Sequence, residues 1–108
     1  MTAAYAYLWE YLVPAETARE FERVYGPEGD WAALFRRHPG YRRTELLRDL
    51  DRGRYVTIDH WESREACEAF REAFAAEFQA LDERCERLTS EETLVGEFLV
   101  LSPLGRGF

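Results

Sequence analysis

The sequence contains no lysine and no asparagine, and all 14 of its basic residues are arginine. The missing lysine excludes Schiff-base chemistry, including the usual anchoring of pyridoxal phosphate. There are two cysteines, Cys67 and Cys85. On one straight helix they would be about 27 Å apart, far beyond the reach of a disulfide. We therefore expect both to be reduced core residues.

Several functional signatures are also missing. The chain has no Gly-x-Ser-x-Gly motif, no phosphate-binding glycine loop and no cysteine–histidine spacing typical of a metal site. No apolar run approaches the roughly 20 residues of a membrane span, and the N-terminus lacks the basic and apolar regions of a signal peptide. A net charge of −7 disfavours binding to nucleic acid and to anionic membranes. These absences predict a soluble cytoplasmic protein without a metal, a nucleic-acid partner or a membrane partner.

The composition is that of a folded protein. The chain has 108 residues, of which 46% are hydrophobic and 15% aromatic. This length suits one hydrophobic core. We therefore predict a single domain over residues 1–108, with its core at about 5–101 and a mobile tail at 102–108.

The hydrophobic pattern alternates between strand and helix periodicity. It predicts strands at 5–13, 41–49, 54–61 and 93–101, with a helix after Pro14 and a short one after residue 30. A longer helix begins near residue 63, with a break near 75–76, and Gly96 predicts a bulge in the last strand. The order βαββαβ indicates an α+β, ferredoxin-like fold with a four-stranded antiparallel sheet.

The first strand is apolar on both faces. Its odd-numbered residues include Tyr5, Tyr7 and Trp9, and its even-numbered residues include Leu8 and Leu12. The helices of this fold cover only one face of the sheet, so the other face invites burial against a partner. We expect a homodimer that packs through the open sheet face.

The third strand ends in Asp59, His60 and Trp61, just before a helix that Ser63 can cap. Because side chains alternate along a strand, Asp59 and Trp61 share one face and His60 takes the other, toward the dimer. An aromatic ring beside a carboxyl group under a helix can line a pocket. The alternative is that Trp61 is a core residue at the junction of sheet and helix.

The chain resembles the antibiotic biosynthesis monooxygenase family of dimeric α+β barrels. The resemblance rests on the Trp61-Glu-Ser-Arg-Glu-Ala66 segment followed by Phe70, the Pro39-Gly40-Tyr41 lead into the second strand, and the closing Leu94-Val-Gly96-Glu-Phe98. It extends from about residue 5 to 101. Members include cofactor-free quinone-forming monooxygenases and haem-degrading enzymes.

The resemblance implies that Trp61 matches a pocket-lining tryptophan of the haem-degrading members. Those members also have an asparagine on the first strand and a histidine on the helix. The corresponding places here fall near Leu8 and near Phe70 or Arg71. Neither place holds the expected asparagine or histidine, which counts against haem degradation.

A cofactor-free oxygenase needs an aromatic pocket and one base, because a deprotonated phenol can itself donate an electron to oxygen. Asp59 and Glu10 are the candidate bases if burial raises their pKa values; the alternative is that each pairs with an arginine. The substrate-binding candidates are Trp61, Tyr55, Phe74 and Trp31. The resulting prediction is a small monooxygenase for an aromatic or phenolic molecule, without a cofactor. The alternative is a non-catalytic dimer that binds a small apolar ligand.

Overall fold

The computed structural model describes residues 3–102 and confirms the predicted order of strands and helices. Residues 103–108 of the expected mobile tail lie outside the described part. The elements are β1 (Tyr5–Leu12), the 3-10 helix η1 (Ala15–Thr17), α1 (Ala18–Tyr25), α2 (Asp30–Phe35), β2 (Tyr41–Arg48), β3 (Arg54–Trp61), α3 (Arg64–Ala73), α4 (Ala75–Cys85), η2 (Glu86–Leu88) and β4 (Glu91–Leu99).

The four strands form one antiparallel sheet in the order β2-β3-β1-β4, which is the ferredoxin-like arrangement predicted from the sequence. β1 pairs with β3 in register from Tyr5 opposite Trp61 to Leu12 opposite Arg54. The pairing of β1 with β4 shifts between Leu8 and Trp9, opposite Gly96 and Leu94. This shift is the bulge that Gly96 indicated.

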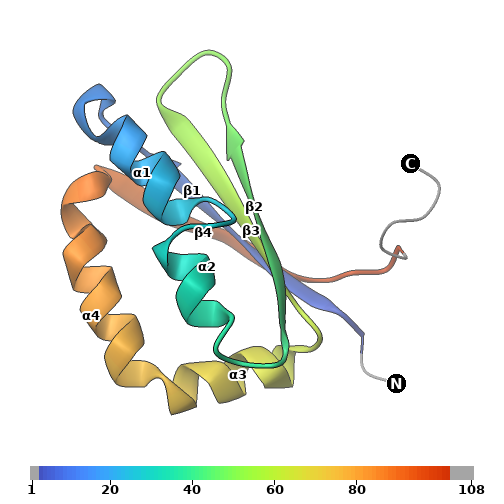
Figure 1. The fold of residues 1–108 in the computed structure, drawn as a ribbon. Coiled ribbons are helices and arrows are strands. Elements are labelled where there is room, and N and C mark those ends of the chain that lie inside the picture. The colour runs from blue at the N-terminus through green and yellow to red at the C-terminus, as the bar shows by residue number, and fades with distance from the viewer. Residues whose placement is uncertain (1–2, 103–108) are drawn as a thin grey trace.

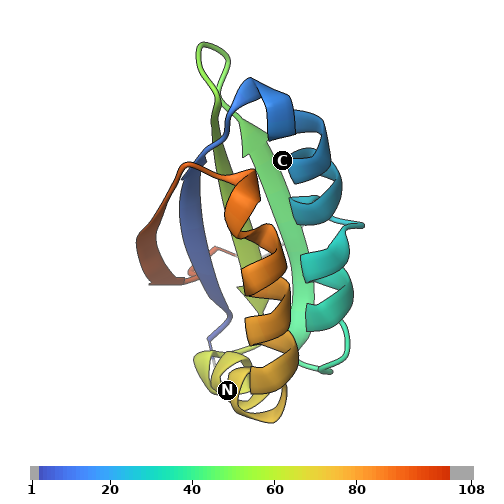
Figure 2. The same ribbon diagram turned by 90° about the vertical axis from the view of Figure 1, so that its left-hand side faces the viewer.

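All helices lie on one face of the sheet (Figure 1), with α1 and α2 in one row beside α4 (Figure 2). The core between the layers is mainly aromatic, and Trp61, Phe21 and Phe70 are among its fully buried side chains. β4 extends past the helices at the edge of the sheet (Figure 2), and its residues are almost all exposed. The helix layer therefore covers β1, β2 and β3 but leaves β4 open.

The long helix predicted after Ser63 is divided into α3 and α4, which run in different directions (Figure 1). The division falls at Phe74, whose φ of −117° and ψ of 28° are not helical, so the break lies just before the predicted position. The straight helix assumed for the cysteines does not exist, although Cys67 and Cys85 are both free and buried. Ser63 caps α3 as predicted, because its Oγ accepts a hydrogen bond from the backbone N–H of Ala66 at 3.0 Å.

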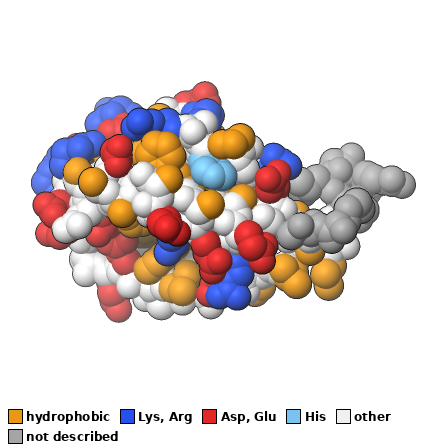
Figure 3. Space-filling model, turned by 90° about the horizontal axis from the view of Figure 1, so that it is seen from below, with side chains coloured by type: hydrophobic (Ala, Val, Ile, Leu, Met, Phe, Trp, Pro, Cys, Tyr) orange, Lys and Arg blue, Asp and Glu red, His pale blue; other side chains and the backbone are white. Residues whose placement is uncertain are grey.

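The surface mixes charges of both signs. Seen from below, acidic and arginine side chains are interspersed, with hydrophobic groups between them (Figure 3). No helix within residues 3–102 is both long enough and apolar enough to cross a bilayer.

Candidate functional site

A cavity of about 260 Å³ lies between the sheet and the helices, and most of its wall is aromatic. Its volume is just below the roughly 300–1,000 Å³ typical of small-molecule sites. The sheet supplies alternate residues of β1, while α2 and α4 close the other side, where Trp31 and Phe78 meet edge to face at 5.0 Å. The aromatic lining residues are Tyr7, Trp9, Tyr11, Tyr25, Trp31, Phe35 and Phe78.

The polar groups of the cavity are few and come from five different elements. They are Thr44, Thr57, Asp59, Arg71, Asp82 and Glu92. Thr57 shares a hydrogen bond of 2.9 Å with the hydroxyl of Tyr11, which fixes that part of the wall. The indole Nε1 of Trp31 is buried and has no hydrogen-bond partner among residues 3–102.

Asp59 is the buried carboxyl group of this cavity, with only 5% of the residue exposed. Its Oδ1 accepts a hydrogen bond of 2.6 Å from the hydroxyl of Thr44, its neighbour across β2 and β3. Tyr41 in turn hydrogen-bonds the Thr44 hydroxyl at 2.7 Å. Since Thr44 donates its proton to Asp59, the Tyr41 hydroxyl donates to Thr44.

The environment of Asp59 disfavours its charged form. Burial raises the pKa of this carboxyl group to about 7, while the Thr44 hydrogen bond and the positive charge of Arg71 act in the opposite direction. Asp59 forms no ion pair with any arginine in the part of the chain that the structure describes. Of the two alternatives for Asp59, the unpaired carboxyl group is therefore the one observed. It can take up a proton near neutral pH.

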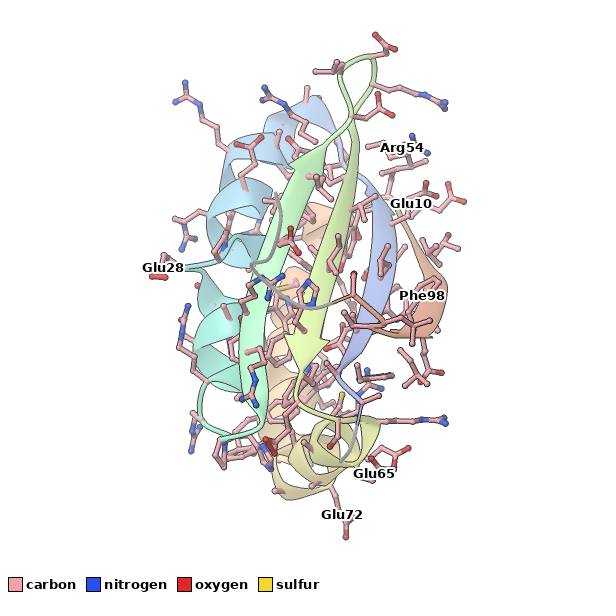
Figure 4. The ribbon with its side chains drawn as sticks, turned by 90° about the vertical axis from the view of Figure 1, so that its right-hand side faces the viewer. Glu10, Glu28, Arg54, Glu65, Glu72 and Phe98 are labelled. Carbon is pink, nitrogen blue, oxygen red and sulfur yellow. The ribbon has the colours of Figure 1, made fainter. Side chains whose placement is uncertain are left out.

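Glu10 lies on the opposite face of the sheet and does not reach the cavity. Its Oε2 accepts a hydrogen bond from Nη1 of Arg54 at 2.9 Å, and Arg54 also binds Asp49 at 2.7 Å. Figure 4 shows Glu10 and Arg54 close together on the open side of the sheet. The reason is the phase of β1, in which the odd-numbered residues face the helices and Glu10 is even-numbered. For this residue, the arginine-paired alternative is the one observed.

Among the predicted substrate-binding residues, the structure brings only Trp31 to the cavity together with Asp59. Trp61 is completely buried behind the wall, with its ring centroid 5.7 Å from that of Phe35 and 5.2 Å from that of Phe70. This position is the core alternative considered for Trp61, and its part in binding stays a prediction.

Tyr55 and Phe74 pack elsewhere. Tyr55 lies against Phe21, and its hydroxyl donates a hydrogen bond to Glu22. Phe74 stacks on Phe70 at the division between α3 and α4. Neither lines the cavity, so their proposed contact with a substrate receives no support from this geometry.

Neither histidine lines the cavity. His60 lies on the open face, as alternation predicted, and its Nε2 is 2.6 Å from Oε2 of Glu45. His38 accepts a hydrogen bond from the backbone N–H of Gly40 through Nδ1. Burial raises the pKa of the Cys67 thiol to about 11, which disfavours a reactive thiolate. Within residues 3–102, no three acidic, histidine or cysteine side chains are grouped to hold a metal ion.

Sequence reasoning missed several lining residues. Strand alternation could have identified three of them. Tyr7 and Tyr11 share one face of β1, and Thr57 shares a face of β3 with Asp59. Arg71 follows Cys67 by one helical turn and so shares its face of α3. Asp82 and Glu92 carried no such signal, because their positions depend on the direction that α4 takes after Phe74.

Comparison with known proteins identifies the family. The model of the antibiotic biosynthesis monooxygenase family matches residues 5–84. A search of curated proteins found no match. Among solved structures, a mutant of SnoaB, a cofactor-independent oxygenase from Streptomyces nogalater, is 29% identical with a TM-score of 0.75, and the alignment covers 96% of this chain and 99% of that one.

Two further structures show how widely the fold is shared. A mutant of MhuD with two manganese protoporphyrin IX molecules bound per active site is 27% identical, with a TM-score of 0.68 over 94% of this chain and 98% of that one. A protein from Nitrosomonas europaea is 18% identical, with a TM-score of 0.71 over 97% of each chain, and shows the shared fold alone. Because the family model spans most of the sequence, the chain belongs to the antibiotic biosynthesis monooxygenase family.

Proposed function

We propose that the protein is a cofactor-independent monooxygenase that oxidises a phenolic aromatic molecule in the cavity, with Asp59 as the general base. The observation that carries this proposal is a buried, unpaired carboxyl group facing an aromatic cavity. An aromatic wall suits a planar ring, and a base with a pKa of about 7 is better matched to a phenol than an ordinary aspartate is. The similarity to SnoaB supports the same class of reaction.

The chemistry needs only the substrate, oxygen and a base. The Asp59 carboxylate removes the phenol proton, and the electron-rich phenolate passes one electron to O₂. The resulting phenoxyl radical and superoxide combine to form a carbon–oxygen bond, giving a peroxide. The peroxide takes up the proton held by Asp59, and its O–O bond breaks as the same ring carbon loses its C–H proton. The released hydroxide and that proton leave as water, and the product is the quinone. The sum is one phenol plus one O₂ to one quinone plus one H₂O.

The lining residues do not fit haem. Among the described residues that line the cavity there is no histidine or cysteine, so the usual nitrogen and sulfur ligands of haem iron are missing there. Tyr7, Tyr11 and Tyr25 do line it, but burial raises the pKa of all three well above the usual range for tyrosine. Phenolate ligation of iron is therefore disfavoured as well.

The test compares the two carboxyl groups predicted as bases. Parent protein, Asp59→Asn and Glu10→Gln are incubated with a panel of naphthols and hydroxylated tricyclic aromatics, with a metal chelator and heavy-isotope oxygen gas. We expect the parent and Glu10→Gln to form a quinone carrying one heavy oxygen atom, at similar rates. In Asp59→Asn the rate of quinone formation should fall about 100-fold or more, because this is the usual contribution of a general base.

The outcome also separates the enzyme from the ligand-binding alternative. If the parent binds these phenols but consumes no oxygen with any of them, a non-catalytic binding protein is the better description. Equal turnover by the parent and Asp59→Asn would contradict the role of Asp59 while leaving the oxygenase assignment in place.

We further propose that the protein works as a homodimer formed through the open face of the sheet. The support is the apolar surface that the helices leave uncovered: Leu47 on β2 is 49% exposed and Phe98 on β4 is 47% exposed. Figure 4 shows Phe98 at the edge of this face. The interface should bury more than roughly 1,200 Å², the lower bound for standard interfaces. Light scattering at micromolar concentration should give twice the chain mass, and a stable folded monomer would contradict the proposal.

A further inference from the structure

A second cavity adjoins the first on the side of β4 and α3. Its volume is also about 260 Å³, and it shares Tyr7, Trp9 and Arg71 with the aromatic cavity. The shared residues form the partition between the two spaces. Arg71 therefore borders both cavities and can be contacted by a molecule that occupies the aromatic one.

Arg71 forms no ion pair with any residue between 3 and 102. Its guanidinium lies over the ring of Tyr7, 5.4 Å from the centroid, and 5.7 Å from the centroid of Phe78. These rings hold the side chain against the partition without neutralising its charge. Arg64, which also lines the second cavity, is in contrast occupied by Glu68 at 3.4 Å and Glu97 at 3.6 Å.

The ionisable groups divide the aromatic cavity into two ends. Arg71 is the one cationic side chain of its lining and lies near enough to Asp59 to influence its pKa. At the other end, burial raises the pKa of Glu92, and the negative charge of Asp82 raises it further. A negatively charged substituent is thus attracted toward Arg71 and repelled from Asp82 and Glu92.

We propose that Arg71 binds a carboxylate carried by the substrate, so that the substrate class is an aromatic acid with a phenolic hydroxyl. The hydroxyl group lies at Asp59, the ring lies between the aromatic walls, and the carboxylate lies at Arg71, directed toward the second cavity. This assignment rests on the proposed aromatic site. It deepens that proposal by giving the substrate two polar anchors rather than one.

The physical argument for a carboxylate is the guanidinium itself. Arginine presents two parallel N–H donors that match the two oxygens of a carboxylate, and such pairs are stronger than neutral hydrogen bonds. The protein carries a net charge of −7, so its overall field does not attract an anion. Recognition of an acidic substrate must then depend on a local cation, and the lining of the aromatic cavity offers Arg71 for this role.

The experiment measures binding and does not depend on turnover. Naphthol and hydroxynaphthoate with the same ring and hydroxyl position are titrated by calorimetry into the parent, Arg71→Gln, Arg71→Lys and Arg37→Gln. Arg37 is the matched control because its guanidinium also lies over a ring, that of Phe74 at 4.8 Å, but outside both cavities. The parent should bind hydroxynaphthoate about tenfold or more tightly than naphthol, as expected for a hydrogen bond to a charged group.

Arg71→Gln should abolish that preference while leaving the affinity for naphthol within about twofold, and Arg37→Gln should keep it. Arg71→Lys should retain part of the preference, because its charge remains but its paired donors are lost. Equal affinity of the parent for the two ligands, no measurable binding of hydroxynaphthoate, or an unchanged preference in Arg71→Gln would each overturn the inference.

Failure of the oxygenase proposal gives a different result. If the protein is not an oxygenase, hydroxynaphthoate still binds through Arg71, but no quinone forms in any variant. If Asp59 is the base and Arg71 has no role, naphthol and hydroxynaphthoate are turned over alike by the parent and by Arg71→Gln.

Discussion

Replacing Asp59 with asparagine should change how the stability of the protein depends on pH. The carboxyl group has a pKa of 3.8 when unperturbed and about 7 in the folded protein. Between these values the folded state binds a proton that the unfolded state has released, so the free energy of unfolding falls as pH rises. The difference of about 3 in pKa corresponds to a total loss of about 4 kcal/mol, complete once pH exceeds about 7.

The asparagine variant removes this titration and little else. Its side chain has nearly the same shape, and its Oδ1 can still accept the hydrogen bond that Thr44 donates to Asp59. The variant should therefore resemble the parent at low pH and become the more stable of the two as pH rises. From pH 5 to pH 8 the difference in free energy of unfolding should grow by about 2 to 3 kcal/mol in favour of asparagine.

Urea unfolding of both proteins at the same concentration, in steps across this range, measures the effect. Subtracting one curve from the other cancels the titration of groups that both proteins share, such as Glu92. A difference that stays constant within about half a kcal/mol from pH 5 to pH 8 would refute the reasoning, because it would mean that burial does not raise the pKa of Asp59.

Three further predictions follow from the same cavity and core. Thr44→Val removes the donor to Asp59 and should raise the pKa of that carboxyl group by about one unit or more, measured by carbon NMR of the labelled side chain; an unchanged pKa would contradict the hydrogen bond. Trp61→Ala should lower the free energy of unfolding by about 3 to 5 kcal/mol in urea, because the ring is completely buried; a loss below about 1 kcal/mol would contradict its core position. Haem titrated into the protein should give no saturable shift of its main absorption band, whereas a tight complex that opens the ring with a reductant would overturn the exclusion of haem.

Local patterns predicted the elements well because each carried a physical signal. Alternation on β3 placed Asp59 and Trp61 toward the helices and His60 toward the open face, which is where the structure has them. Ser63 fixed the start of α3 by capping it. It was harder to predict which face of β1 points toward the helices, because both faces are apolar. The hydrophobic pattern therefore did not exclude Glu10 from the pocket.

The composition of the cavity was the least predictable part. It depends on the division of the long helix at Phe74, after which α4 takes a new direction and Phe78 lines the cavity together with residues of β1. With a straight helix, Phe74 would be a reasonable wall; with the helix divided, Phe74 closes the junction instead. Trp61 lies at the end of β3 beneath Phe70, so the residue that most resembled a pocket wall became part of the core.

The central claim is that Asp59 acts as a base inside the aromatic cavity. The most direct measurement is the pH dependence of kcat/KM for oxygen-dependent turnover of a phenol, in the presence of a metal chelator. For the parent, the rate should rise with pH and level off above an apparent pKa of about 7, as the carboxyl group loses its proton. In Asp59→Asn the residual rate should lack this step. An identical step in the variant, or a flat profile in the parent, would contradict the account.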